Sequence, residues 1–296
     1  NTQQIAVRRD TVWWRVQGQL FMVAGGKLQY VPTPGEGGFV SAMLLAADGL
    51  WITRGASAYR YTAGRWDAFP FLIDSTEVAP VIHRIMQTSD GSTWLAGSYG
   101  VYRVADRYVV PHMVNGSSLA YLPGITSLAT DNNGSVWMGT SSGAVCLAGA
   151  SLFYYNKRNG LTDNSINDVL RDGEGNIWIA SDGQGIFRFS GTQFTALDEA
   201  AGLPSAQVMS LAWNGADSLY IGTYDAGIYI FNNGKVRALS FPSEPVPAIM
   251  SLAYAPDGRL WMGTRGRGLW SYDNGIFRQY AAPEQDFPSN YVNSLY

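Results

Sequence analysis

Residues 171–189, RDGEGNIWIASDGQGIFRF, have close counterparts along the whole chain. Residues 130–147 read TDNNGSVWMGTSSGAVCL, and residues 255–272 read APDGRLWMGTRGRGLWSY. The aromatic residue after each turn recurs at intervals of 38 to 43 residues in the 296-residue sequence, at Trp13, Trp51, Trp94, Trp137, Trp178, Tyr220 and Trp261. A repeat of roughly 20 to 50 residues is typical of solenoids, arrays and propellers. Units of this length account for nearly the whole chain.

The unit that begins at Ile166 indicates what each repeat builds. Four short runs are rich in β-branched and aromatic residues and are separated by glycine, aspartate or asparagine: INDVLRD, IWIAS, IFRFS and QFTAL. Such runs are typical of strands, and the residues between them suit tight hairpins. No long window carries the apolar spacing of a helix. Each unit is therefore predicted to be a four-stranded antiparallel sheet.

The second strand of each unit is apolar on both faces. Residues 177–180 read IWIA and residues 260–263 read LWMG. A sheet that is wet on one side would alternate apolar and polar residues, whereas sheets stacked around an axis are covered on both faces. Small residues mark the place where neighbouring sheets come close, at Ala96, Gly139, Ala180, Gly222 and Gly263. We therefore predict an all-β fold, a seven-bladed β-propeller of four-stranded antiparallel blades.

The ends of the chain decide how the ring closes. Residues 1–296 are predicted to form a single propeller domain of seven repeats, and residues 287–296 resemble the first strand of a further repeat. We expect this strand to pair with the N-terminal unit, which would remove two open sheet edges. The run IAVRRD at residues 5–10 competes for the same position, and the sequence leaves both alternatives open. Because the last repeat stops before its turn, we expect more chain to follow.

Composition excludes several classes of protein. Apolar residues make up 46% of the sequence and charged residues 15%, as is typical of a globular protein. The net charge of −3 argues against nucleic acid as a binding partner. The single cysteine, Cys146, excludes an intramolecular disulfide and a cysteine-based zinc site. No window approaches the roughly 18 apolar residues of a membrane-spanning helix. Any membrane attachment is therefore expected from segments outside this chain.

Catalytic motifs are missing from the sequence. The two histidines, His83 and His112, have no acidic residues at metal-ligand spacing, and no GxSxG, HExxH or P-loop occurs. We predict no catalytic residues, no metal site and no cofactor. His83 lies on a predicted inner strand and is therefore the one candidate for a channel histidine.

Variable loops are the better candidates for function. The connections between the second and third strands gather on one face of a propeller, near the mouth of its channel, where concave surfaces bind ligands. In this chain they carry charged and aromatic residues: Arg54, Tyr99, Asp182, Gln184, Tyr224, Asp225, Arg265 and Arg267. Arginine pairs can hold a carboxylate or sulfate, and tyrosines can stack on a sugar ring. We predict ligand binding by these eight residues.

The repeat itself resembles that of a known family. Residues 160–189, GLTDNSINDVLRDGEGNIWIASDGQGIFRF, and residues 202–231 are similar to the two-component regulator propeller repeat, and the units before about residue 80 are looser. The resemblance implies a periplasmic, non-catalytic sensor region of an inner-membrane receptor with a histidine kinase or diguanylate cyclase output domain. It implies an unidentified small-molecule or oligosaccharide ligand and a homodimer formed through the parent receptor.

Two alternatives stay open. The repeats also look related to those of virginiamycin B lyase, a metal-dependent propeller enzyme, for which His83 would be the candidate histidine. The other alternative is a scaffold propeller that binds only protein.

Overall fold

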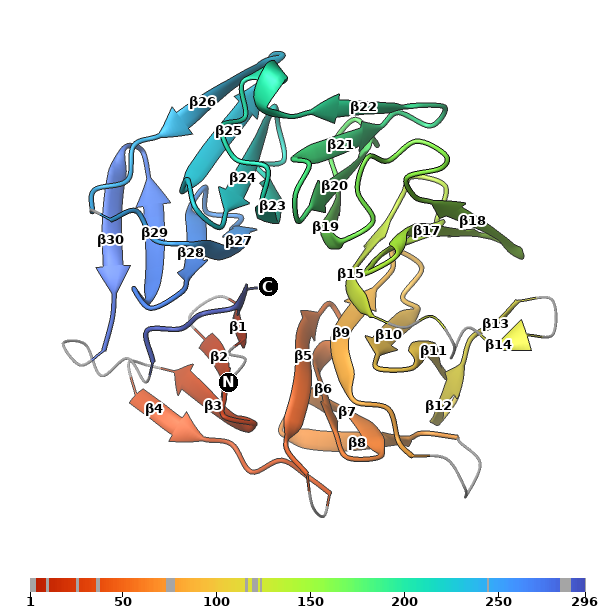
Figure 1. Ribbon diagram of the computed structural model, residues 1–296. Coiled ribbons are helices and arrows are strands. Elements are labelled where there is room, and N and C mark those ends of the chain that lie inside the picture. Colours follow the sequence, from red (N-terminus) through yellow and green to blue (C-terminus); the bar gives the residue numbers. More distant parts are fainter. Residues whose placement is uncertain are drawn as a thin grey trace.

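The computed structural model describes residues 4–8, 11–24, 27–35, 38–72, 78–114, 117–118, 122, 124–243, 245–282 and 289–295. Seven sheets surround a central axis (Figure 1), and the predicted all-β, seven-bladed propeller is confirmed. In each blade the strands follow the chain from the axis outward and pair antiparallel with their neighbours. The repeat of about forty residues is therefore one blade.

The first four blades occupy the N-terminal half of the ring. Blade 1 contains β1 (Gln4–Arg8), β2 (Thr11–Val16), β3 (Gln19–Ala24) and β4 (Lys27–Tyr30). Blade 2 contains β5 (Val40–Ala46), β6 (Gly49–Arg54), β7 (Ser57–Thr62) and β8 (Arg65–Pro70). Blade 3 contains β9 (Ile82–Gln87), β10 (Thr93–Gly97), β11 (Gly100–Ala105) and β12 (Tyr108–Pro111). Blade 4 contains β15 (Ile125–Thr130), β16 (Val136–Thr140), β17 (Gly143–Ala148) and β18 (Ser151–Tyr155).

The remaining blades complete the ring. Blade 5 contains β19 (Ile166–Arg171), β20 (Ile177–Ser181), β21 (Ile186–Phe189) and β22 (Phe194–Leu197). Blade 6 contains β23 (Val208–Trp213), β24 (Ser218–Thr223), β25 (Ile228–Asn232) and β26 (Lys235–Leu239). Blade 7 contains β27 (Ile249–Tyr254), β28 (Leu260–Thr264), β29 (Leu269–Asp273) and β30 (Ile276–Tyr280). The connections add a small hairpin, β13 (Met113–Val114) with β14 (Ser117–Ser118), and the 3-10 helix η2 (Glu199–Ala201).

The aspartate of the first turn links the repeat sequence to the blade. In blade 5, Asp172 accepts hydrogen bonds from the backbone N–H groups of Glu174 and Asn176, both at 2.9 Å, and from the indole of Trp178 at 2.7 Å. Asp131 accepts from the Trp137 indole in blade 4 in the same way. One carboxylate therefore closes the turn and fixes the buried tryptophan that follows it.

Close packing between blades explains the small residues after the tryptophans. Every residue of β16 and β20 is buried, as expected for strands covered on both faces. A Cβ on Gly222 would lie 2.7 Å from Cγ2 of Ile249 in the next blade, and a Cβ on Gly139 would lie 2.8 Å from Cγ2 of Ile166. Neighbouring sheets thus approach to a distance that leaves no room for a larger side chain.

Polar side chains also join the inner strands of adjacent blades, in an arrangement we call the inner latch. Ser127 accepts a hydrogen bond from the backbone N–H of Val169 at 3.1 Å. At the equivalent positions of the next two blades, Asp168 accepts from Leu211 at 2.9 Å and Ser210 accepts from Leu252 at 2.7 Å. In blade 7, the Ser251 hydroxyl has no hydrogen-bond partner within the described part of the chain.

Both terminal stretches lie at the junction of blades 7 and 1. β1 pairs antiparallel with β2, so the N-terminal run forms the first strand of blade 1. β31 (Ser294–Leu295) pairs parallel with β1, through Gln4 with Ser294 and Ile5 with Leu295. Residues 287, 288 and 296 of the expected closing strand lie outside the described residues. The two competing stretches therefore occupy adjacent positions in one five-stranded sheet.

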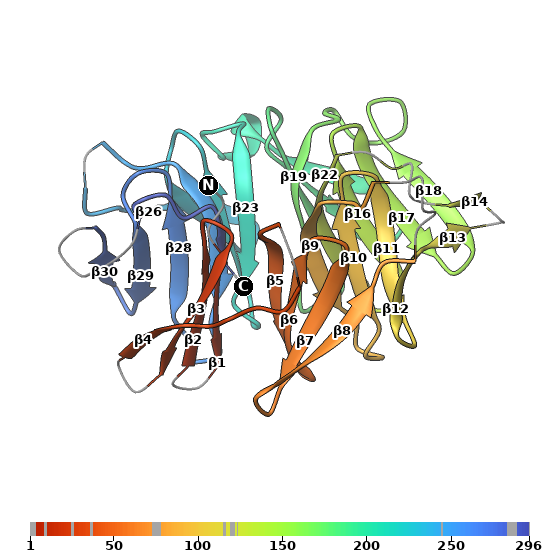
Figure 2. The ribbon, with the colours of Figure 1, turned by 90° about the horizontal axis from the view of Figure 1, so that it is seen from below.

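The ring has two distinct faces, which are visible when it is viewed from its edge (Figure 2). The connections from second to third strands and from fourth strands to the next blade share one face, here called the loop face, and η2 marks it at the top of Figure 2. The other face, here called the turn face, carries the first-to-second and third-to-fourth connections, such as the turn between β7 and β8.

Candidate functional site

The eight predicted ligand-binding residues lie on the loop face. Arg54 ends β6, and the other seven lie between second and third strands: Tyr99, Asp182, Gln184, Tyr224, Asp225, Arg265 and Arg267. The backbone holds these loops in place by a repeated bond, from the N–H of the first loop residue to a carbonyl just before the inner strand of the same blade. Asp182 donates to Ser165 at 3.0 Å, and Arg265 donates to Ala248 at 3.1 Å. The loop tips are therefore anchored before any ligand arrives.

Two of the predicted residues meet across a blade boundary. The Arg265 guanidinium of blade 7 donates a hydrogen bond to the Tyr224 hydroxyl of blade 6 and lies over the same ring, 5.6 Å from its centroid. Tyr224 is 38% exposed. The pair thus presents a cationic group and an aromatic face at the surface.

A third residue lies beside this pair through its backbone, and the sequence analysis did not include it. Tyr291 is 54% exposed and forms an isolated antiparallel bridge with Arg265. We call Tyr224, Arg265 and Tyr291 the aromatic cluster. The signal for Tyr291 was available, because it stands directly before Val292, in register with the loop residues that precede the inner strands. Aromatic faces beside a cation suit the apolar face of a sugar ring and its polar substituents.

The other predicted residues have different surroundings on the loop face. The Arg54 side chain donates to the carbonyl and hydroxyl oxygens of Thr33, at 2.8 and 2.9 Å. The carboxylate of Asp225 accepts a hydrogen bond from the buried Ser205 hydroxyl. Tyr99, Asp182, Gln184 and Arg267 are exposed, with Asp182 and Gln184 in one loop and Arg267 in the loop of Arg265. The structure therefore brings the side chains of Tyr224 and Arg265 into contact and leaves Arg54, Tyr99, Asp182 and Gln184 on blades 2, 3 and 5; binding by the full set of eight stays a prediction.

The two histidines lie at opposite edges of blade 3. His83 is on β9, the innermost strand, where burial and the charges of Arg84 and Arg15 lower its pKa. His112 follows β12, the outermost strand, and packs against Trp94 at 4.7 Å between ring centroids. Among the described residues, no group of three or more His, Cys, Asp or Glu side chains lies close enough together to hold a metal ion.

The central channel contains polar groups that the sequence analysis missed. A cavity of about 320 Å³ is lined by the inner strands, and Arg84 and Asp168 are the charged residues in its described lining. Burial raises the pKa of Asp168, although hydrogen bonds from Leu211 and Ser127 and the charge of Arg84 oppose the rise. At the position where the inner strands of blades 4, 6 and 7 carry serine, blades 3 and 5 carry arginine and aspartate, and this difference was the available signal.

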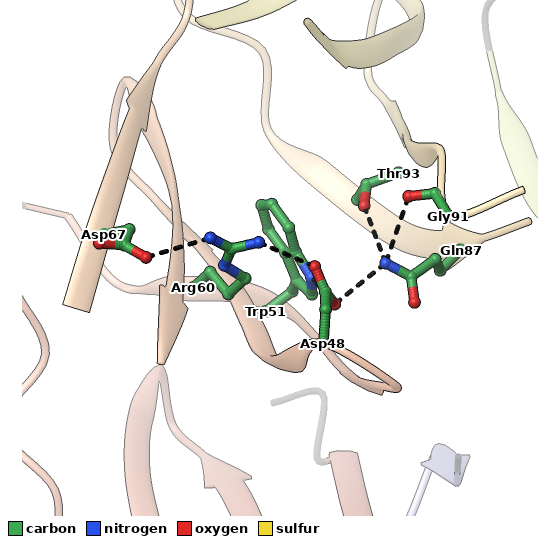
Figure 3. A network of polar contacts seen from close by, with 7 residues as sticks. All are labelled: Asp48, Trp51, Arg60, Asp67, Gln87, Gly91 and Thr93. Atoms are coloured by element: carbon green, nitrogen blue, oxygen red, sulfur yellow. Dashed lines mark hydrogen bonds and ion pairs between the residues drawn. The ribbon is translucent and has the colours of Figure 1, made fainter. Parts of the chain in front are cut away.

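The turn face carries a structural network between blades 2 and 3 (Figure 3). Asp48 accepts hydrogen bonds from Trp51 at 2.9 Å and from Gln87 of blade 3 at 3.0 Å, and Arg60 bridges it to Asp67. Burial alone would raise the pKa of Asp48, but these hydrogen bonds and the charge of Arg60 lower it. Because every charged group here is paired within the protein, we interpret the network as support for the blade junction.

Comparison with known proteins agrees with the repeat and the fold. Residues 160–183 match the two-component regulator propeller family. No curated protein matches the chain in sequence. Among solved structures, virginiamycin B lyase from Staphylococcus aureus is similar, with a TM-score of 0.68 and 13% identity, and the match covers 88% of this chain and 90% of the lyase.

Extracellular domains of hybrid two-component systems from B. thetaiotaomicron are similar as well. BT4673 gives a TM-score of 0.51 and 18% identity, covering 97% of this chain and 42% of that domain. BT3049 gives a TM-score of 0.50 and 17% identity, covering 96% of this chain and 46% of that domain. The chain thus spans less than half of each of these two domains, and identities this low show the fold alone.

The described residues contain no helix that is long and apolar enough to cross a membrane. The resemblance of the repeat is confirmed by the family match, which falls within residues 160–189, one of the two stretches named for it. The chain is thus a seven-bladed β-propeller that carries a repeat of the two-component regulator propeller family.

Proposed function

We propose that this propeller is the extracytoplasmic sensor region of a membrane-bound two-component-type receptor, lies in the periplasm and binds a ligand on its loop face without catalysing a reaction. The observation that carries the proposal is the family match at residues 160–183, within a propeller whose blades repeat the same pattern. The similar extracellular domains of hybrid two-component systems support it at the level of fold.

The aromatic cluster is the proposed centre of the ligand site. Tyr224 and Tyr291 offer exposed rings, and Arg265 offers a guanidinium that already makes a hydrogen bond and a cation–π contact within the cluster. This chemistry suits an oligosaccharide or a small polar molecule: rings stack on the sugar, and the guanidinium donates to its oxygens. Because the loop backbones are anchored, little conformational entropy is lost on binding.

Signal transfer requires two receptor states with different affinities for the ligand. In this proposal, the ligand changes how propellers of a receptor homodimer meet and thereby shifts the equilibrium of the output domain. A ligand with equal affinity for both arrangements would produce no signal.

The test is a thermal-shift panel of oligosaccharides, amino acids and divalent metal ions on the purified chain. A ligand at 100 times its Kd stabilises the folded state by about 2.7 kcal/mol, which is readily measured. Arg265→Gln should abolish the shift caused by a loop-face ligand. Arg259→Gln is a matched control, because Arg259 is in the same blade, on the turn face, and also lies over an aromatic ring, at 5.8 Å.

The possible outcomes separate the alternatives. A shift by an oligosaccharide that disappears in Arg265→Gln and persists in Arg259→Gln supports the sensor proposal. A shift by metal ions alone that disappears in His83→Ala contradicts it and favours an enzyme like the lyase. No shift with any compound contradicts it and favours a scaffold that binds only protein.

A further inference from the structure

The cavity of the central channel, here called the axial cavity, is a second candidate binding site, with polar groups that the proposed function does not use. Its volume of about 320 Å³ lies at the lower end of the range for small-molecule pockets. Its wall is made by the inner strands, so the groups that line it come from rigid elements and not from loops. The aromatic cluster is not part of this lining.

Two opposite charges face the cavity without neutralising each other directly. Arg84 of blade 3 and Asp168 of blade 5 both line it, with blade 4 between them. Burial raises the pKa of Asp168 and the charge of Arg84 opposes this rise, but no ion pair joins the two side chains in the described part of the chain. An arginine and a carboxylate that line one cavity without an ion pair between them are complementary to a ligand that carries both charges.

Each charged group keeps hydrogen-bonding capacity for a ligand. The Arg84 guanidinium has five N–H donors and makes one hydrogen bond among the described residues, to the carbonyl of His83 at 3.2 Å. Asp168 accepts from Ser127 and Val169 at Oδ1, but only from Leu211 at Oδ2. Because a carboxylate can accept about four hydrogen bonds, Oδ2 can still accept one from a ligand.

Three methionines contribute to the apolar part of the lining. Met86, Met209 and Met250 come from three different inner strands and are only half-buried. Their flexible, polarisable side chains adapt to varied apolar groups. A ligand held by its charged end at Arg84 and Asp168 would therefore place an aliphatic portion against these methionines.

We propose that the axial cavity binds a free α-amino acid with an aliphatic side chain, its carboxylate on Arg84 and its ammonium group on Asp168. This site is separate from the loop-face site and does not depend on it. An amino acid is neutral overall, so each of its two charges can pair with an opposite charge of the cavity without adding a net charge to the site.

Isothermal titration calorimetry with L-norleucine tests the proposal on the purified chain. Hexanoate lacks the ammonium group and pentylamine lacks the carboxylate, and each should bind at least tenfold more weakly. Arg84→Gln and Asp168→Ser should each weaken norleucine binding by about 10- to 100-fold. Asp168→Ser introduces the residue type found at the equivalent positions Ser127 and Ser210, so an acceptor for the backbone N–H of Leu211 is retained in the inner latch.

Controls separate this site from the rest of the molecule. Arg103→Gln removes an exposed arginine of the same blade and should leave norleucine binding unchanged. Arg265→Gln should also leave it unchanged. No binding of norleucine at 10 mM (about ten times a weak, millimolar Kd), equal binding of hexanoate, or loss of binding only in Arg265→Gln would each overturn the proposal. Unchanged melting temperatures would verify that the variants fold.

Discussion

Ser210 and Ser251 occupy equivalent positions in blades 6 and 7 but differ in their hydrogen bonds. Both are buried, at 5% and 7% exposure. Ser210 accepts the backbone N–H of Leu252 at 2.7 Å, whereas the Ser251 hydroxyl has no partner in the part of the chain that is described. Replacing each by alanine therefore compares the same chemical change with and without an inner-latch bond.

The expected magnitudes follow from this difference. Ser210→Ala leaves the N–H of Leu252 without its acceptor, which should cost about 1 to 2 kcal/mol of unfolding free energy. Ser251→Ala removes a buried hydroxyl that gains nothing in hydrogen bonding, so stability should stay the same or rise by up to about 1 kcal/mol. At roughly 2 to 3 °C per kcal/mol, Ser210→Ala should lower Tm by about 2 to 6 °C.

Differential scanning calorimetry on the two variants and the unchanged chain measures the effect, and urea denaturation provides a second value. Equal m-values would verify that the same surface is exposed on unfolding. Equal losses in both variants would refute the reasoning, because they would show that the hydroxyl matters through packing and not through the bond to the next blade. A loss confined to Ser251→Ala would refute it more strongly.

Three further measurements follow from the same structure. In urea denaturation, Asp172→Ala should lower the unfolding free energy by about 2 to 4 kcal/mol, because the Trp178 indole loses its acceptor. As a control, Asp257→Ala at an exposed position should lower it by under about 0.5 kcal/mol. Equal effects would contradict the role of the turn aspartate. Gly263→Ala should cost about 1 to 3 kcal/mol, since its Cβ would lie 2.6 Å from the Val292 carbonyl oxygen; a neutral result would mean that this segment does not lie against β28. Burial would raise the pKa of Asp131, but hydrogen bonds lower it overall. The contribution of Asp131 to stability is therefore present above an unfolded pKa of about 3.9 and is lost as pH falls through the lower folded value. In melts from pH 5 downward, the dependence of Tm on pH should be flatter in Asp131→Asn than in the unchanged chain, and an identical slope would contradict this.

The repeat made the blades predictable from the sequence. Each copy carries its own turn signals, such as Asp172 before Trp178, so errors in one unit are corrected by the others. The position of the second-to-third loops then followed from propeller topology alone. For this reason the sequence analysis placed Tyr224 and Arg265 on one face without knowing that they touch.

The channel was not predictable in the same way. Most inner strands shift register after their first residue, as between Ile166 and Asp168 or Val208 and Ser210. A bulge of this kind breaks the two-residue alternation on which strand patterns depend and re-aims the side chains beside it. The departure from serine at Arg84 and Asp168 is visible in the sequence, but the pattern did not show that both side chains line one cavity.

The repeat pattern indicated a further inner strand at residues 287–296, but it left open whether this strand or residues 5–10 would take the closing position, because long-range pairing leaves no local pattern. β31 has two residues and pairs in parallel with β1, almost the full chain length away. The contact between Ser205 and Asp225 was missed for a similar reason, since a loop hydroxyl and a loop carboxylate twenty residues apart carry no joint signature.

Hydrogen–deuterium exchange of the purified propeller, with and without the oligosaccharide that gives the largest thermal shift, tests the sensor account most directly. The account predicts that ligand slows exchange in the loops at residues 224–227 and 265–268 and around Tyr291, while the turn-face residues 172–176 exchange as before. Protection confined to the turn face, or identical exchange with and without the sugar, would contradict ligand sensing at the aromatic cluster.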